Sequence, residues 1–512
     1  MIPRKHQLEA LEAIEKNNEG IIHLPTASGK TLIQAIAISD NIEKGFQFNE
    51  LPVFVIMAPR IILCNQLYRI IKDTLFENKK DCHYLIVHSG RAVDNIKKMW
   101  STELPFRQLK STTNVKEIKE EAKKARSEKV PLIIFSTYDS SERIVNAEIP
   151  VYMTLCDEAQ YIVSSEFNWI SHENEVDTIK QFNSFRKYYF TATLKETYSD
   201  SGIGMNNSKL FGSIIYEKTP LEMINAGEIV RPRIHLVDIG NKNDNLNEID
   251  SDVNAIIDSF IEHRVHCNVG AKLLVVTKGS EHLNDITRHP KMINLREIRP
   301  MLKIFDISAA YQPRINGEIV KREEFLKQLQ NLTDADEAII FHINILSEGI
   351  DVPGITGIMP MTMMGIGKFL QTLGRATRLH PRDRDKIYDK SLGINDLDKF
   401  YKPYAWIIIP IYSEIGNDLK EFFSEIIYTL REHGFNASED VVIKENRGKT
   451  IPVPIGGVNE VNKRAKALFD LFVEVEHEIE EKEIADKLDV EDFRMGEEIR
   501  NMSNDELINV LA

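Results

Sequence analysis

The chain has 512 residues, a net charge of −14 and four scattered cysteines. This length suggests about three domains of ~100–200 residues each, and cysteines that form no C-x-x-C pair argue against a disulfide framework or a zinc module. No apolar run is long enough to cross a bilayer, and residues 1–6 contain no apolar signal segment, so we expect a soluble, cytoplasmic protein that does not enter a membrane.

The negative charge is concentrated near the end of the chain. Residues 471–512 contain fourteen Asp or Glu against four Lys or Arg, so this segment alone carries −10 of the −14. The remainder is close to neutral. A basic groove that binds nucleic acid therefore stays compatible with the acidic total.

In chain order, Arg4 and Gln7 come first, at the start of a short amphipathic helix predicted over 7–15. Taken alone they would form an exposed polar face. Because they stand just ahead of a predicted phosphate loop, an adenine contact is the alternative: the forked amide of Gln7 can read the N6/N7 edge of adenine.

That loop lies between an apolar run at 20–24, which predicts a buried strand, and a helical pattern at 32–38. Unpaired backbone N–H groups and the dipole at a helix start attract a polyphosphate. Lys30 can reach the β- and γ-phosphates of ATP, and Thr31 can hold Mg²⁺. Leu24 replaces the first Gly of the strict pattern, so the flanking strand and helix carry the prediction. The predicted ATP loop comprises Leu24, Pro25, Thr26, Ala27, Ser28, Gly29, Lys30 and Thr31.

Further apolar runs alternate with helical segments, which predicts a doubly wound parallel sheet with ligands at the carboxyl ends of its strands. These runs lie at 52–58, 85–90, 131–135, 151–156 and 188–190. Asp157 and Glu158 directly follow one of them. Asp157 could hold Mg²⁺ through water, and Glu158 could orient and deprotonate an attacking water. An acidic helix start is the alternative, but we favour catalysis because a phosphate loop is predicted on the same sheet.

Several motifs in this order resemble those of superfamily 2 helicases and translocases. Residues 25–31 resemble motif I, 157–160 motif II (Asp-Glu-Ala-Gln) and 191–193 motif III (Thr-Ala-Thr); in the second half, 272–278 resemble motif IV, 345–353 motif V and 371–378 motif VI, Q-x-x-G-R-x-x-R without a mismatch. The resemblance implies an α/β fold with two tandem RecA-like domains of parallel sheet. We expect the first domain at 1–218, a linker at 219–232, the second domain at 233–415 and a mostly helical, acidic C-terminal extension at 416–512.

Motif VI contains two arginines three residues apart. On a helix Arg375 and Arg378 share one face, which could be a solvated face. With Gln371 and Gly374 in register, we favour arginine fingers that stabilise transition-state charge from the second domain, so that hydrolysis needs no partner subunit.

The resemblance implies further roles for individual residues. Lys30 and Thr31 would hold the phosphates and the metal from the first domain. Gly349 and Asp351 would contact the nucleotide, Gln371 would help position the attacking water, and Thr191 and Thr193 would couple hydrolysis to domain movement. The resemblance also implies a nucleic-acid track along Arg60, Thr137, Thr277 and Ser347, although ordinary loop chemistry is as good an interpretation of these four.

We therefore expect an ATP- and Mg²⁺-dependent nucleic-acid helicase or translocase. Gln160 departs from the Asp-Glu-Ala-Asp and Asp-Glu-x-His boxes, and only three residues precede Arg4, where DEAD-box RNA helicases carry an adenine-reading segment. These features favour the group of phage recombination helicases of the UvsW kind and restriction-enzyme motor subunits, and thus DNA as partner. An RNA helicase and an ATP-hydrolysing clamp or sensor that does not separate strands remain alternatives. The acidic tail either provides solubility or docks a regulatory partner.

Overall fold

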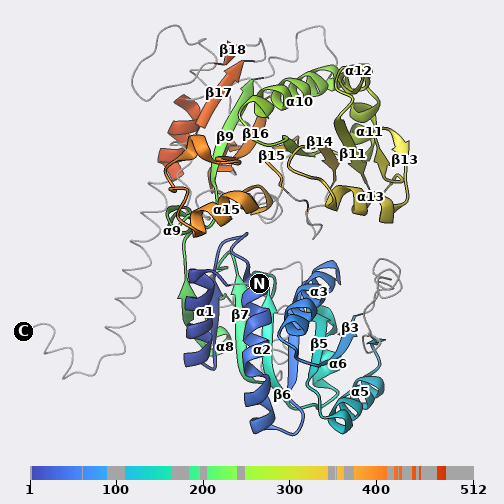
Figure 1. Cartoon of the computed structure of the whole chain (residues 1–512), viewed down its shortest axis with the longest axis vertical. Helices are drawn as coiled ribbons and strands as arrows, with labels where there is room; N and C mark the ends of the chain where they lie inside the picture. Colours follow the sequence, from blue (N-terminus) through green and yellow to red (C-terminus); the bar gives the residue numbers. More distant parts are fainter. Residues whose placement is uncertain are drawn as a thin grey trace, which may run out of the picture.

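The computed structural model describes two parallel-sheet units that are stacked along the long axis of the molecule (Figure 1). The described residues are 3–59, 61–88, 110–163, 184–195, 204–238, 248–308, 310–343, 352, 354–361, 374–411, 420–421, 423–424, 426–428, 441–445, 449–450 and 470–479. Within them, no helix has both the length and the apolar composition needed to cross a membrane.

The first unit is an eight-stranded sheet in the order β4-β3-β5-β2-β6-β7-β1-β8, and all of its described strand pairs are parallel. Its strands are β1 (Glu19–His23), β2 (Val53–Ala58), β3 (His83–Val87), β4 (Lys110–Ser111), β5 (Leu132–Thr137), β6 (Val151–Asp157), β7 (Ser184–Thr191) and β8 (Ile214–Glu217). Six of these coincide with the predicted apolar runs. The short edge strands β4 and β8 were not predicted, because two to four partly exposed residues give no hydrophobic pattern.

Helices cover both faces of this sheet, and each face has its own buried cluster. They are α1 (Lys5–Lys16), α2 (Lys30–Phe48), α3 (Ile61–Glu77), α5 (Val115–Glu128), α6 (Ser141–Val145) and α8 (Ser208–Phe211); α9 (Pro220–Asn225) follows β8 in the chain and does not lie on this sheet (Figure 1). Parallel strands that are buried on both faces need continuous apolar sequence, which explains why β2, β5 and β6 are buried along their whole length.

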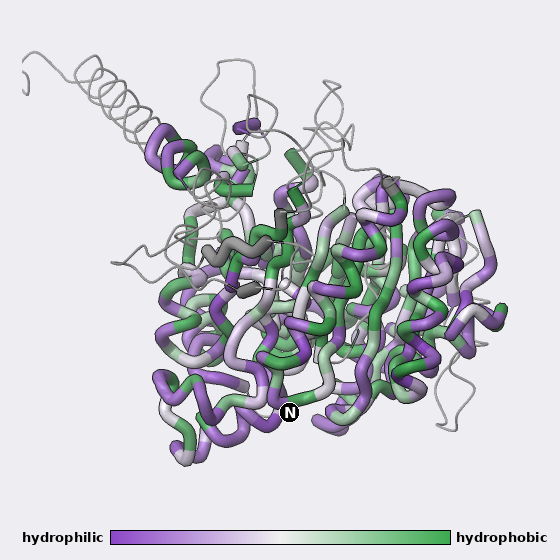
Figure 2. Tube along the Cα trace, turned by 90° about the horizontal axis from the view of Figure 1, so that it is seen from above, coloured by the Kyte–Doolittle hydropathy of each residue, from purple (hydrophilic) through white to green (hydrophobic). Residues whose placement is uncertain are grey.

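The second unit is a ten-stranded sheet in the order β13-β12-β11-β14-β10-β15-β16-β9-β17-β18, parallel at its centre and antiparallel at both edges. Its strands are β9 (Arg231–Asp238), β10 (Lys272–Val276), β11 (Leu302–Ile307), β12 (Arg314–Ile315), β13 (Glu318–Ile319), β14 (Glu337–His342), β15 (Gly357–Pro360), β16 (Tyr404–Ile411), β17 (Val441–Glu445) and β18 (Lys449–Thr450). Its helices include α10 (Glu248–Val265), α11 (Ser280–Arg288), α12 (Pro290–Ile298), α13 (Arg322–Gln330) and α15 (Pro381–Tyr388). Figure 2 shows hydrophobic segments in the interior strands and hydrophilic ones on the outer helices and loops.

Two α/β units built on parallel sheets confirm the predicted tandem RecA-like fold. The described part of 416–512 adds a detail that the sequence did not indicate: β17 pairs in parallel with β9, so this segment contributes strands as well as helical turns. The predicted helical residues Phe423 and Phe472 pack together, with ring centroids 5.1 Å apart, in the core of the second unit. The domain boundaries themselves stay a prediction.

Candidate nucleotide site

The predicted phosphate loop connects β1 to α2, at the carboxyl end of the first sheet. Gly29 precedes α2 in a left-handed conformation, with φ 80°, which favours glycine. Among the described residues, no side chain caps α2, and the fully buried Oγ of Ser28 has no hydrogen-bond partner. An uncapped helix start beside an orphaned hydroxyl fits a bound phosphate.

Lys30 is the first residue of α2 and lies across this loop. Its side chain is buried, and Nζ donates hydrogen bonds to the carbonyl oxygens of Leu24, at 3.0 Å, and Pro25, at 3.3 Å. The ammonium group is therefore held within the loop, where an arriving phosphate could replace one or both carbonyl partners. Thr31 follows it on the same helix and is half-buried.

The acidic pair lies at the end of β6, in the middle of the sheet. Asp157 is buried, and its Oδ1 accepts a hydrogen bond of 2.7 Å from Nε2 of Gln34. Burial, followed by the charge of Glu158, raises the pKa of Asp157 to about 7, although the charge of Lys30 acts in the opposite direction. A buried carboxylate whose charge is incompletely balanced suits a hard cation such as Mg²⁺, with Thr31 and Asp157 as the residues that would hold it. Glu158 has φ 50°, and such a left-handed non-glycine residue is typical of strained functional sites.

A chain of hydrogen bonds runs from Glu158 to the predicted coupling residues. Nε2 of Gln160 donates to Oε2 of Glu158 at 2.8 Å, and Oε1 of Gln160 accepts from the hydroxyl of Thr191 at 2.6 Å. The same hydroxyl accepts from the backbone N–H of Thr193 at 3.1 Å. Gln160 can connect both sides because an amide both donates and accepts. The sequence had indicated this residue only as a departure from related motifs.

The second unit meets the phosphate loop at Gly374. A Cβ atom built on Gly374 would collide with the side chain of Thr26, so the backbone of Gly374 lies closer to this side chain than a residue with a Cβ could. Arg375 follows at a half-buried position, and after burial its charge is the second cause that lowers the pKa of His342, to about 3. Arg378 is exposed. The predicted motif VI and the predicted phosphate loop are thus in direct contact.

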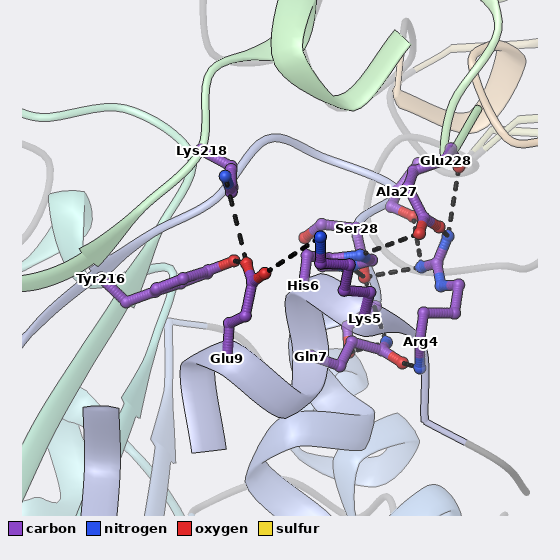
Figure 3. A network of polar contacts seen from close by, with 11 residues as sticks. Arg4, Lys5, His6, Gln7, Glu9, Ala27, Ser28, Tyr216, Lys218 and Glu228 are labelled. Carbon is purple, nitrogen blue, oxygen red and sulfur yellow. Dashed lines mark hydrogen bonds and ion pairs between the residues drawn. The ribbon is translucent and has the colours of Figure 1, made fainter. Parts of the chain in front are cut away.

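Arg4 and Gln7 also reach the loop, as Figure 3 shows. Nη2 of Arg4 donates to the carbonyl oxygen of Ser28 at 2.6 Å, and Nε2 of Gln7 donates to the carbonyl oxygens of Ser28, at 3.2 Å, and Gly29, at 3.3 Å. In this structure both side chains therefore hold the loop backbone, and their contact with adenine stays a prediction. His6, which stands between them at the start of the same predicted helix, belongs to this network, and so does Glu228, which the sequence did not indicate.

Thr137 and Thr277 are predicted to contact nucleic acid. They lie at the carboxyl ends of β5 and β10, as expected, but both are buried. The hydroxyl of Thr137 donates to Oγ of Ser140 at 3.1 Å, and the backbone N–H of Thr277 donates to the carbonyl oxygen of His342 at 3.0 Å. Their contact with nucleic acid stays a prediction. The predicted site residues that lie outside the described residues are Arg60, Ser347, Gly349, Asp351 and Gln371, and residues 480–512 of the acidic tail lie outside them as well.

Comparisons with known proteins agree with this geometry. Residues 4–201 match the family model described as DEAD/DEAH box helicase. No curated protein sequence matches the chain. Among solved structures, the ATP-dependent Type ISP restriction-modification enzyme LlaBIII bound to DNA is similar, with a TM-score of 0.62 and 15% identity over 92% of this chain and 33% of that chain.

Two further solved structures are similar to the chain. A nuclease-deletion mutant of the Type ISP enzyme LlaGI in complex with a DNA substrate mimic has a TM-score of 0.53 and 16% identity, over 84% of this chain and 28% of that chain. S. cerevisiae Dbp5 bound to RNA and ADP BeF3 has a TM-score of 0.47 and 11% identity, over 93% of this chain and 94% of that chain. The chain spans about a third of the length of the two restriction-modification enzymes, and at these identities the likeness concerns the fold. Residues 4–201 are thus similar to the DEAD/DEAH box helicase family, and the two parallel-sheet units share their fold with the two restriction-modification enzymes.

Proposed function

We propose that this chain is an ATP-dependent motor that moves along or unwinds nucleic acid, and that DNA is its track. The observation that carries the proposal is the contact between Gly374 and Thr26. Gly374 belongs to the segment that contains Arg375 and Arg378, so a nucleotide bound between the units could be contacted from both sides.

We assign one role in ATP hydrolysis to each of the predicted site residues that the structure describes. The loop around Lys30 binds the β- and γ-phosphates, and Thr31 and Asp157 hold Mg²⁺, which supplies positive charge at the phosphates. Glu158 orients a water molecule and accepts its proton. Arg375 and Arg378 stabilise the charge that develops on the transferred phosphoryl group. Gln160 and Thr191 then transmit a change at Glu158 toward Thr193.

DNA is favoured over RNA for two reasons. The motif 157–160 ends in Gln160 rather than in Asp or His, and the two similar structures with TM-scores of 0.62 and 0.53 are of enzymes bound to DNA or to a DNA substrate mimic. An RNA helicase and a clamp that hydrolyses ATP without separating strands are the competing functions. Each makes a different prediction in the same assay.

The experiment measures ATP hydrolysis with single-stranded, duplex, forked and four-way DNA and with RNA of matched length, together with strand displacement. We expect DNA to stimulate hydrolysis more than RNA does. E158Q should still bind ATP but lose hydrolysis by about 10³-fold or more, since it removes the general base. Greater stimulation by RNA would favour the RNA helicase. Stimulated hydrolysis that displaces a bound roadblock protein but no strand would favour the clamp, and unaltered hydrolysis in E158Q would contradict a catalytic role for this site.

A further inference from the structure

Residues 228–230 contact Arg4 and His6, which hold the phosphate loop, on one side and the arginine segment 374–378 on the other. They lie between α9 and β9, within the predicted linker. Both contacts join residues that are far apart in the sequence. Glu228 and Arg4, for example, are separated by 224 positions. A short stretch of chain thus connects the phosphate loop, through Arg4 and His6, with the arginine segment.

On the loop side, Glu228 holds the two side chains that hold Ser28 (Figure 3). Nη1 of Arg4 donates to Oε2 of Glu228 at 2.9 Å and to its backbone oxygen at 3.1 Å, and Nδ1 of His6 lies 3.4 Å from Oε1. The same Arg4 donates to the carbonyl oxygen of Ser28 at 2.6 Å, and Nε2 of His6 lies 2.8 Å from that oxygen. Two side chains therefore connect one linker carboxylate to one loop carbonyl.

The carboxylate at this position is largely buried and charged. The side chain of Glu228 is 14% exposed, and that of His6 only 4%. Burial by itself would raise the pKa of Glu228, but the nearby His6 and the charge of Arg4 lower it. Charge-assisted hydrogen bonds of this kind are stronger than neutral ones. Removing the carboxylate would leave Arg4 and His6 without this partner, which is costly in a buried place.

On the arginine side, the contacts are made by the backbone. Ile229 forms an antiparallel bridge with Arg378, and the N–H of Val230 donates to the carbonyl oxygen of Thr377 at 2.9 Å. Both linker residues are 3% exposed. Three residues of chain span at most ~10 Å, so little slack separates the carboxylate from the arginine segment.

We propose that Glu228 is a positioning residue that links the phosphate loop to the arginine segment through residues 228–230. It acts through Arg4 and His6, and it holds Ser28 and Thr377 in register before any nucleotide binds. The consequence for hydrolysis rests on the function proposed above. The link itself is a property of the ligand-free protein and can be tested without activity.

Amide hydrogen exchange of the ligand-free full chain tests the link in E228A. We expect exchange to become about ten-fold faster both in the loop 24–31 and in the segment 374–378, because local opening follows the loss of tertiary contacts. E121A is the matched control. Glu121 is also a largely buried glutamate between a histidine and a cation, 2.6 Å from Nε2 of His83 and 3.0 Å from Nζ of Lys110, but it lies on α5. Its exchange changes should be confined to α5 and β3.

The inference is overturned if E228A speeds exchange only at 226–230 and leaves both distant segments as in the unaltered chain. If E228A does not fold, E228Q decides the question, because it keeps the side-chain volume and removes the charge. E228D keeps the charge and should recover part of the protection in both segments, which a purely steric role of residue 228 would not predict.

Kinetics separate this inference from the proposed function. In E228A we expect kcat for ATP to fall about ten-fold while KM changes less than about three-fold, because a positioning residue supports the reacting geometry more than binding. Unchanged kcat would overturn the role in hydrolysis. If the unaltered chain hydrolyses no ATP, the proposed function fails, while the exchange experiment still decides whether Glu228 links the two segments.

Discussion

Gly374 of the second unit lies against Thr26 of the phosphate loop so closely that a single added methyl group would collide with the threonine side chain. The two residues lie outside the strands and belong to different units. Their contact brings Arg375 to the edge of the proposed nucleotide site. This relationship gives the most direct test of how the two units cooperate.

We expect G374A to push the arginine segment away from the phosphate loop. A displacement of about 1 Å from a reacting geometry can reduce turnover by ~10²-fold, so kcat for ATP should fall by about that factor while nucleotide binding, measured with a fluorescent ATP analogue, changes little. G393A is the control, since a Cβ there makes ordinary contacts with Asp396 and should leave turnover unaltered. Equal activity of both variants would contradict the close approach.

Gln160 should couple hydrolysis to movement. Because its amide connects Glu158 to Thr191, Q160A and T191V interrupt the same chain of hydrogen bonds. Effects of residues in one network are not additive, with interaction energies of ~0.5–3 kcal/mol. The double variant should therefore reduce strand displacement per ATP hydrolysed no more than the stronger single variant does, as measured by parallel unwinding and ATPase assays. Multiplicative losses would show that the two side chains act independently.

We expect Lys402 to stabilise the position of the arginine segment through a hydrogen bond to its backbone. It is 2% exposed, and Nζ donates to the carbonyl oxygens of Ile355, at 3.0 Å, and Arg378. Burial, followed by the charge of Arg378, lowers its pKa to about 7. K402M keeps much of the volume but leaves two buried carbonyls without this donor, so we expect a loss of ~2 kcal/mol in the free energy of unfolding and slower ATP hydrolysis. Chemical denaturation and ATPase assays measure both.

K399M serves as the control for this variant. Lys399 is exposed and pairs only with Asp396 among the contacts described for it, so neither unfolding nor hydrolysis should change. A K402M protein as stable and as active as K399M would show that Lys402 does not support Arg378.

The buried His263 on α10 should make the protein sensitive to acid. Its Nε2 lies 2.7 Å from Oγ1 of Thr356, and burial, followed by the charges of His235 and His266, lowers its pKa to about 3. The unfolded chain takes up a proton near pH 6.5 that the folded state does not accept until about pH 3. The stability associated with neutral His263 is therefore complete above pH 6.5 and is lost as the pH falls below it, by ~2 kcal/mol at pH 5.

H263Q should flatten this dependence, since glutamine can bond to Thr356 but does not titrate. Urea unfolding of both proteins between pH 7.5 and pH 5 provides the measurement. Parallel stability curves in H263Q and the unaltered chain would show that another group is responsible for the loss in acid.

The sequence by itself determined the parallel strands and the residues able to handle a phosphate. Continuous apolar runs such as those of β2 and β6, broken by small or acidic residues at their ends, are local patterns, and buried parallel strands require them. The motifs that contain Lys30, Asp157, Thr191 and Arg375 likewise led to the prediction that these side chains belong to one site. Short edge strands such as β8, and the pairing of β17 with β9, left no such pattern.

Only the tertiary structure decided which of these residues meet and what supports them. Nothing in the sequence distinguishes Glu228 from the other acidic residues among seventy-eight, because its proposed role depends on Arg4, 224 positions away, and on His6. The sequence likewise does not indicate that Gly374 packs against Thr26 or that Lys402 donates a hydrogen bond to the carbonyl oxygen of Arg378. Local periodicity reports which face of an element is buried, whereas a contact between distant segments depends on how whole sheets and helices pack, and that information is not contained in any short window of the chain.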